Sequence, residues 1–260
     1  TSLQNNRIKN ISRLITKNKE RKEQWLFIVE GARELSLALT SNYVVDSAYI
    51  CPELFEKTDY PEIIHRLDPN LVFELDLPVF QKIAYRENSD GVLALIRSQS
   101  HTLADLNLPE NPFLIVLESV EKPGNLGAIL RTADAAKVDA VIICDPLTDI
   151  YNPNVIRSSV GCLFTVPVAV SSNTETLEFL QKRRIKSYAA ELTAAQYYQD
   201  TDFTVSSAII MGTEADGLTS FWLEHADVRI KIPMRGVIDS LNVSVSTAVL
   251  TFEGMRQRGF

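Results

Sequence analysis

Three segments of the chain combine glycines with charged or amide side chains directly after short apolar stretches. They run Glu121-Lys122-Pro123-Gly124-Asn125-Leu126-Gly127, then Gly212-Thr213-Glu214-Ala215-Asp216-Gly217-Leu218, then Ile232-Pro233-Met234-Arg235-Gly236 with Asp239-Ser240-Leu241-Asn242 behind it. Arg131 follows the first segment by one helical turn. Glycines let a backbone approach a ligand closely, and α/β sheets bind ligands at the carboxyl ends of their strands. These segments therefore predict one polar ligand site.

The known nucleotide-binding patterns are absent from these segments. The first segment lacks both the GxxxxGK[ST] of a P-loop and the GxGxxG of a dinucleotide site. A Rossmann-type oxidoreductase is therefore disfavoured. Asp239 or Ser240 suits the N-cap of a last helix. A cap does not account for Asn242, which we place inside that helix, where an amide needs a partner.

The elements that must position these segments form two α/β patterns. In the first, we expect a basic helix at residues 7–19, strands at 25–29, 43–50, 71–75 and 92–96, and helices at 32–39, 60–67 and 79–85. In the second, we expect strands at 113–118, 140–144, 185–190, 208–211 and 228–232, and helices at 127–137, 174–183 and 239–258. Residues 97–111 are typical of a linker. The predicted domains are thus 1–96 and 112–260, the second a parallel sheet with helices on both faces.

The last predicted helix carries one apolar face, made of Leu241, Val245, Ala248, Phe252 and Met255. Apolar residues at i, i+4, i+7, i+11 and i+14 share one side of a helix. Val243, Val249 and Leu250 lie on the other side, so we expect burial on two sides.

Composition narrows the class of protein. Of the 260 residues, 45% are hydrophobic and 23% are charged, as in ordinary globular proteins. No apolar run reaches the roughly 18 residues of a membrane span, and a polar, basic beginning argues against a signal peptide. Three dispersed cysteines and three isolated histidines predict neither disulfides nor a metal site, and they suit the cytoplasm. The chain begins at Thr1 rather than Met, so we expect residues to precede it.

Charge is unevenly distributed along the chain. Seven cations and two carboxylates give residues 1–24 a net charge of +5, although the whole chain carries −7. A basic segment on an acidic body is expected where one end of a protein touches phosphate, although a solvated helix face gives the same pattern.

Taken in order, the motifs N-L-G-x-x-x-R, G-x-E-x-x-G-L, I-P-M-x-G and S-L-N-V-S-V resemble the SpoU (TrmH-like) branch of the SPOUT RNA methyltransferases. The resemblance covers Phe113–Arg258 and includes the segment Asn152–Gly161. The first domain resembles, more weakly, the L30e-like RNA-binding domain often found ahead of it, through Ile28–Arg33 and Asp90–Val92. The resemblance implies an enzyme that uses S-adenosylmethionine to methylate a ribose 2′-hydroxyl in RNA, with 23S ribosomal RNA the expected substrate. It also implies a C-terminal trefoil knot and a homodimer with the active site near the subunit interface.

The resemblance also assigns residues. Gly212, Ile232, Met234 and Leu241 would bind the cofactor, and the polar active-site positions are Asn125, Arg131, Glu214, Ser240 and Asn242. For RNA contacts we expect Arg7, Arg13, Lys17 and Arg157. Arg131 is the favoured catalytic residue of the family. Because a guanidinium does not readily lose its proton, we expect Arg131 to hold a phosphate and stabilise the developing alkoxide. Ser240 and Asn242 would orient the hydroxyl or Arg131, and Glu214 would position Arg131 or the nucleotide.

Two other functions remain open. The chain could methylate a tRNA ribose, or it could bind RNA without catalysis on the same fold. The intact polar set disfavours the second, and the added N-terminal domain favours ribosomal RNA over tRNA.

Overall fold

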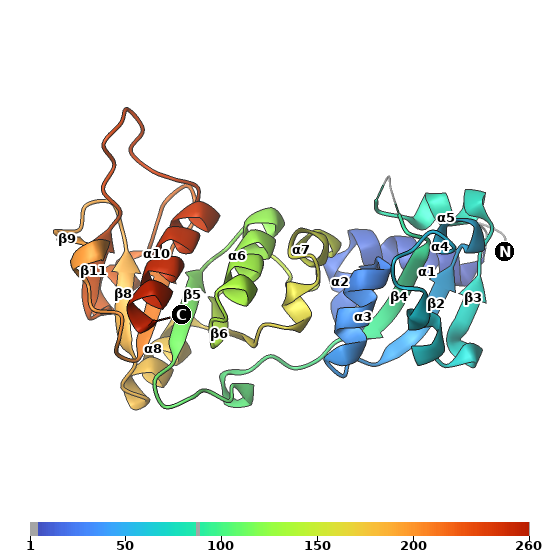
Figure 1. Cartoon of the computed structure of the whole chain (residues 1–260), viewed down its shortest axis with the longest axis horizontal. Coiled ribbons are helices and arrows are strands. Elements are labelled where there is room, and N and C mark those ends of the chain that lie inside the picture. Colours follow the sequence, from blue (N-terminus) through green and yellow to red (C-terminus); the bar gives the residue numbers. More distant parts are fainter. Residues whose placement is uncertain (1–4, 87–88, 260) are drawn as a thin grey trace. The chain divides into compact units, whose positions relative to one another are not determined.

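The chain folds into two compact units in a computed structural model that describes residues 5–86 and 89–259. One unit contains the residues up to Gln99 together with Asp149–Thr165, and the other contains Ser100–Thr148 and the residues from Val166 onward. Figure 1 colours the chain by sequence position, from blue at the N-terminus to red at the C-terminus. The segment Asp149–Thr165 packs with the N-terminal unit, although it lies in the sequence inside the predicted domain 112–260.

The N-terminal unit is built on a four-stranded mixed sheet in the order β1-β4-β2-β3. Strand β4 is antiparallel to β1 and β2, and β2 is parallel to β3. The elements of this unit are α1 (Asn6–Thr16), α2 (Asn18–Gln24), β1 (Leu26–Glu30), α3 (Ala32–Thr40), β2 (Val45–Ile50), α4 (Pro52–Phe55), η1 (Pro61–Arg66), η2 (Pro69–Leu71), β3 (Val72–Glu74), α5 (Leu77–Ile83), β4 (Val92–Arg97), α7 (Pro153–Ser158) and η4 (Cys162–Phe164).

The basic helix predicted at residues 7–19 is in fact two helices. Helix α1 buries Ile8, Ile11 and Leu14, and the Asn5 side chain caps its first turn. The chain becomes extended at Lys17, and α2 starts directly behind it. The helix predicted at 60–67 is a 3₁₀ helix, η1, which begins at Pro61.

An aromatic cluster joins the segment Asp149–Thr165 to the rest of the N-terminal unit. Phe27 of β1 stacks on Tyr151, with ring centroids 4.1 Å apart, and Tyr43 meets Phe164 edge-on at 5.0 Å. All four rings are buried. The segment is therefore part of the core of this unit.

The C-terminal unit is built on a seven-stranded sheet in the order β7-β6-β5-β10-β8-β11-β9. Every pair of neighbouring strands is parallel. Its elements are η3 (Leu103–Asp105), β5 (Phe113–Glu118), α6 (Pro123–Ala135), β6 (Ala140–Cys144), β7 (Val168–Ser171), α8 (Asn173–Lys182), β8 (Lys186–Ala190), β9 (Gln196–Tyr197), η5 (Tyr198–Asp200), β10 (Ser207–Met211), α9 (Ser220–His225), β11 (Val228–Lys231) and α10 (Val243–Arg258).

Helices cover this parallel sheet. Helices α6 and α10 pack against one another and α10 also contacts β5 and β10, while α8 packs on β6 and β8 (Figure 1). The central strands β5, β6 and β10 are buried along their whole length. The predicted fold class is therefore confirmed for the sheet. Strands β7 and β9 were not predicted.

The predictions for the last helix were wrong in two respects. Helix α10 begins at Val243, not Asp239, because Asn242 is its N-cap. Val245 and Phe252, which belong to the predicted apolar face, are exposed by 48% and 42%. The helix instead buries Thr247, Leu250, Thr251 and Gly254, small or compact residues that allow a close approach to β5.

A buried carboxylate ties the ends of three elements together. Glu118, the last residue of β5, accepts hydrogen bonds from the backbone N–H and the hydroxyl of Thr219 at 2.8 and 2.6 Å. It also accepts one from the amide of Asn173, at 2.7 Å. The loop that ends at Thr219 is thereby anchored beside the carboxyl end of β5.

Within the described residues, no helix is long and apolar enough to cross a membrane.

Candidate active site

The predicted polar segments meet at one edge of the parallel sheet. They follow β5, β10 and β11, whose carboxyl ends all point the same way. A cavity of about 420 Å³ opens at this edge, between the ends of β8, β10 and β11 and the start of α10. All four residues expected to bind the cofactor line it, namely Gly212, Ile232, Met234 and Leu241.

Gly212 begins a tight turn on the wall of this cavity. The Thr213 N–H donates to the Gly217 carbonyl at 2.9 Å, the Gly217 N–H donates back at 3.2 Å, and Gly217 has a φ of +70°. A Cβ added to Gly212 would overlap the backbone of Gly217 and Leu218. Glycine is therefore required by the turn itself, and a side chain at this position would distort the turn before it filled cofactor space.

Four polar side chains form a hydrogen-bonded network beside the cavity. Glu214 accepts hydrogen bonds from the amide of Asn242 at 2.6 Å and from the amide of Asn125 at 3.4 Å. It also pairs with the ammonium group of Lys122. The amide of Asn242 reaches Asn125 Oδ1 at 3.2 Å. Residues that are 117 positions apart in the sequence thus share one carboxylate.

The environment of Glu214 favours its ionised form. The hydrogen bond from Lys122, followed by that from Asn242, lowers the pKa of the Glu214 carboxyl below its ordinary value of 4.5. Glu214 is therefore negatively charged at neutral pH and is a weak base. Its chemistry here is to hold cationic and amide groups in fixed positions.

Asn242 has a structural role that the sequence did not reveal. Its Oδ1 accepts hydrogen bonds from the backbone N–H of Ser244 at 2.9 Å and from the Ser244 hydroxyl at 2.6 Å, which caps α10. Because a residue at the N-cap is outside the helix, Asn242 does not need the buried partner expected of an amide in the helix interior. Its amide nitrogen remains available for Glu214 and Asn125.

The other two predicted polar residues are outside this network. Ser240 lines the cavity and donates a hydrogen bond to Asp239 at 3.1 Å. Arg131 lies in α6 and is exposed, and its side chain makes no hydrogen bond or ion pair with another residue in the described part of the chain. The structure thus brings together Asn125, Glu214 and Asn242, and it leaves the guanidinium of Arg131 unengaged.

Sequence reasoning missed two residues at this edge, Lys122 and Glu191. Glu191 directly follows β8 and lines the cavity. One of its carboxylate oxygens, Oε1, is buried and accepts no hydrogen bond, although it forms an ion pair with Arg229 at 3.8 Å. The rule that ligands bind at the carboxyl ends of parallel strands would have indicated both residues.

The residues predicted to contact RNA are on the surface of the N-terminal unit. Arg7, Arg13 and Lys17 are exposed, and Arg157 is exposed above the ring of Tyr85, 5.5 Å from its centroid. Arg21, which contributed to the basic count, is buried. It donates to Asp149 at 2.6 Å and to the Leu14 carbonyl at 2.7 Å, so it cannot contact a phosphate.

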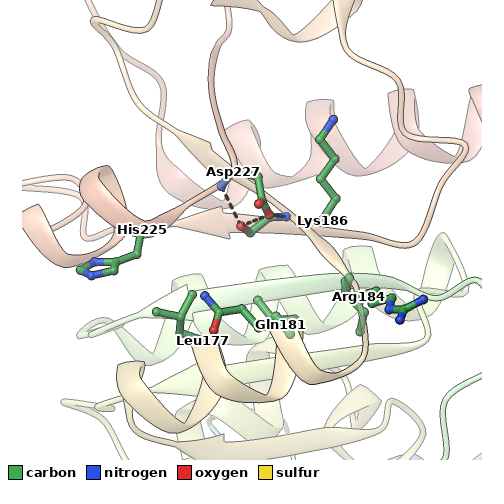
Figure 2. Close-up of a pocket in the computed structure, with 9 residues that line it drawn as sticks. Leu177, Gln181, Arg184, Lys186, His225 and Asp227 are labelled. Atoms are coloured by element: carbon green, nitrogen blue, oxygen red, sulfur yellow. Dashed lines mark hydrogen bonds between the residues drawn. The ribbon is translucent and has the colours of Figure 1, made fainter.

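A second cavity of about 350 Å³ lies at the opposite edge of the same sheet, near the starts of β8 and β11. In Figure 2 the side chains of Arg184, Lys186 and His225, which line it, point in different directions. Its carboxylate, Asp227, already binds the N–H and hydroxyl of Ser187 at 2.8 and 2.7 Å. The side chains do not converge on a ligand, so the first cavity is the candidate active site.

Across the described residues, no group of three His, Cys, Asp or Glu side chains could hold a metal ion.

The parallel sheet and the cavity at its carboxyl edge define an α/β protein with a small-molecule site. Residues 112–252 match the SpoU rRNA Methylase family, and residues 5–94 match the MRM3-like substrate binding domain. The chain belongs to the SpoU family.

Relatives of known structure or function span nearly the whole chain. It is 29% identical over 251 residues to the 23S rRNA (guanosine(2553)-2′-O)-methyltransferase RlmP of Bacillus subtilis strain 168, covering 96% of each chain. A crystal structure of an RNA 2′-O ribose methyltransferase is 36% identical, with a TM-score of 0.85 over 100% of this chain and 98% of that one. The AdoMet-bound rRNA methyltransferase of Sinorhizobium meliloti is 27% identical, with a TM-score of 0.88 over 98% and 96%. The family, the fold class and the enzyme class expected from the motifs are confirmed.

Proposed function

We propose that this protein transfers the methyl group of S-adenosylmethionine to a ribose 2′-hydroxyl of 23S ribosomal RNA. The proposal rests on the cavity at the carboxyl edge of the sheet. Every residue expected to bind the cofactor lines this cavity, and the Glu214 network lies beside it. Relatives named as 23S rRNA 2′-O-methyltransferases and an AdoMet-bound neighbour support it.

The residues of the cavity fit this cofactor. A volume of about 420 Å³ is in the usual range of small-molecule sites, and Leu218, Ile230 and Leu241 give it apolar walls. Glu191 Oε1 accepts no hydrogen bond within the described residues, and the ribose hydroxyls and the ammonium group of the cofactor are donors that suit it. When bound, the cofactor provides an electrophilic methyl group on a sulfonium.

The protein must align the attacking hydroxyl and help it to lose its proton. Arg131, whose guanidinium stays protonated, holds the neighbouring phosphate and stabilises the oxygen as negative charge develops. Ser240, at the cavity, and Asn242 orient the hydroxyl or Arg131. Glu214 fixes Asn242 and Asn125 in position through the bonds described above.

The exposed face of α10 supports a homodimer. Val245 and Phe252 leave apolar surface in water on the helix that starts at the active site, and burying such surface drives association. The occupant we propose is a second copy of the chain, which brings the active site close to the subunit interface. The loops of residues 212–218 and 232–242 belong to a C-terminal trefoil knot in this proposal.

The N-terminal unit supplies much of the affinity for RNA. Arg7, Arg13 and Lys17 are exposed on or beside α1, where they can neutralise phosphates, and Arg157 adds a further cation. The match of residues 5–94 to a substrate binding domain supports the assignment of RNA binding to this unit. Because its substrate is ribosomal RNA, we place the protein in the cytoplasm.

Two measurements test the proposal. Calorimetry should give a micromolar dissociation constant for S-adenosylhomocysteine, a free energy of about −8 kcal/mol. Transfer of labelled methyl to 23S rRNA from a strain that lacks the protein should place the label on one ribose 2′-oxygen. Label on a base would overturn the reaction, and label found on tRNA alone would overturn the substrate.

A further inference from the structure

The N-terminal unit contains a cavity of its own, with a volume of about 270 Å³. Helix α1, η2 and all four strands of the sheet contribute to its walls. Arg7, Asp46, Tyr49 and Phe73 are among its lining residues. This volume is close to the lower end of small-molecule sites, about 300–1,000 Å³, and suits one flat ring better than a long ligand.

An arginine stacked on a phenylalanine forms part of this cavity. The Arg7 guanidinium lies over the Phe73 ring, 4.2 Å from its centroid, and the Tyr49 ring follows at 5.7 Å from Phe73 with a tilt of 31°. Within residues 5–86 and 89–259, the guanidinium makes no hydrogen bond. Its N–H donors are therefore available while its plane is held, an arrangement suited to stacking on an aromatic ligand.

The remaining polar groups argue against a site for a bare anion. Asp46 is the one carboxylate among the lining residues, and it is 3.7 Å from Arg97, beyond hydrogen-bond distance. A free phosphate would be attracted by Arg7 and repelled by Asp46. A ligand with a flat face and both donor and acceptor atoms at its edge satisfies both side chains.

We infer that this cavity receives an unpaired base of the RNA substrate, stacked on the Arg7–Phe73 pair. Sequence-specific RNA recognition uses splayed bases that stack on aromatic side chains or guanidinium planes. The exposed Arg13 and Lys17 at the end of α1 then meet the neighbouring phosphates. The inference rests on the proposed function, since it takes RNA as the substrate.

The test compares two probes of equal charge. One is a fluorescent ten-nucleotide oligouridylate, and the other is the same ribose-phosphate chain without bases. Wild-type protein should bind the first at least about tenfold more tightly, because stacking of a single base contributes a factor of this order. Phe73→Leu keeps the apolar bulk and Arg7→Lys keeps the charge, and each should reduce the difference between the probes to less than about threefold.

Arg13→Ala is the matched control on the same helix, outside the lining of the cavity. It should weaken binding of both probes equally, keep the difference between them, and flatten the salt dependence by about 0.7 for each phosphate that the protein no longer neutralises. Arg7→Lys should leave the salt dependence unchanged. Melting curves of every variant confirm that its N-terminal unit is folded, and Arg7, which is exposed, tolerates substitution even if Phe73 does not.

Equal affinity of wild type for the two probes overturns the inference, as does a preference for the base-containing probe that survives in Arg7→Lys. Neither result contradicts the proposed function, which would be refuted only if the wild-type protein transferred no methyl group to 23S rRNA. Methyl transfer is therefore measured on the same protein preparations.

Discussion

Asn242 connects the stability of α10 with the geometry of the candidate active site, and one pair of substitutions separates these roles. Asn242→Ala removes both the oxygen that caps α10 and the amide that holds Glu214. Asn242→Asp keeps the capping oxygen and replaces only the amide donor, because a carboxylate also accepts the Ser244 N–H.

The magnitudes follow from these bonds. Loss of an N-cap costs about 1 kcal/mol, which lowers the melting temperature of a unit of this size by about 2–4 °C. In Asn242→Asp the added charge at the helix N-terminus stabilises by about 0.3–1 kcal/mol, while repulsion from Glu214 opposes it. We therefore expect the Asp variant to melt within about 1 °C of wild type and the Ala variant clearly below.

The rate of methyl transfer should depend on the second role of Asn242, in which its amide group holds Glu214 and Asn125. Both variants lack the hydrogen bonds from Asn242 to Glu214 and Asn125, so single-turnover methyl transfer should fall at least about tenfold in each. Differential scanning calorimetry and labelled-methyl transfer on the same samples measure the two effects. An Asp variant with the wild-type rate would refute the role of the amide, and one that melts as low as the Ala variant would refute the role of the cap.

Four further predictions concern other residues. Arg131→Ala should leave the melting temperature and cofactor binding unchanged while the rate of methyl transfer falls about a hundredfold or more. Arg131→Lys should lose almost as much activity, since the point charge of an ammonium group does not reproduce the planar guanidinium. A rate within a few-fold of wild type in Arg131→Ala would exclude Arg131 from catalysis. Glu191→Gln should weaken S-adenosylhomocysteine binding about tenfold by calorimetry, because its buried oxygen loses its charge; an unchanged affinity would place the cofactor away from Glu191. Phe252→Glu should convert the proposed dimer to monomers in light scattering, because it puts a charge on the exposed face of α10. A dimer that persists in this variant would mean that the two copies associate through another surface. Lys17→Gln should reduce the salt dependence of RNA binding by about 0.7–0.9, and an unaltered slope would make Lys17 a solvated surface residue.

The sequence identified the strands of the C-terminal unit well because a buried parallel strand is a continuous apolar run. The starts of helices were harder. Asn242 was assigned to the helix interior because a periodicity does not distinguish the N-cap from the first turn, and Pro123 begins α6 four residues before the predicted start. The exposure of Phe252 could not be predicted, since the spacing of apolar residues along a helix does not show whether the chain covers that face.

The motifs predicted residues that line the cavity or lie beside it, but they did not predict the partners of those residues. Only the folded chain shows that Lys122 reaches Glu214, because the two are 92 positions apart. The burial of Arg21 depends on Asp149, which lies 128 positions away. Pairings of this kind leave no local pattern, which is why the basic count overstated the surface available to RNA.

The aromatic cluster of the N-terminal unit sets an order of events during synthesis. Phe27 and Tyr43 leave the ribosome early, but Tyr151 and Phe164, which complete their packing, come more than 100 residues later. Part of the core of this unit therefore forms only after the first strands of the C-terminal unit have been translated. For the same reason, a fragment that stops at Gln99 would keep the contact between Phe27 and Tyr43 but would lack the Tyr151 and Phe164 rings that pack on them.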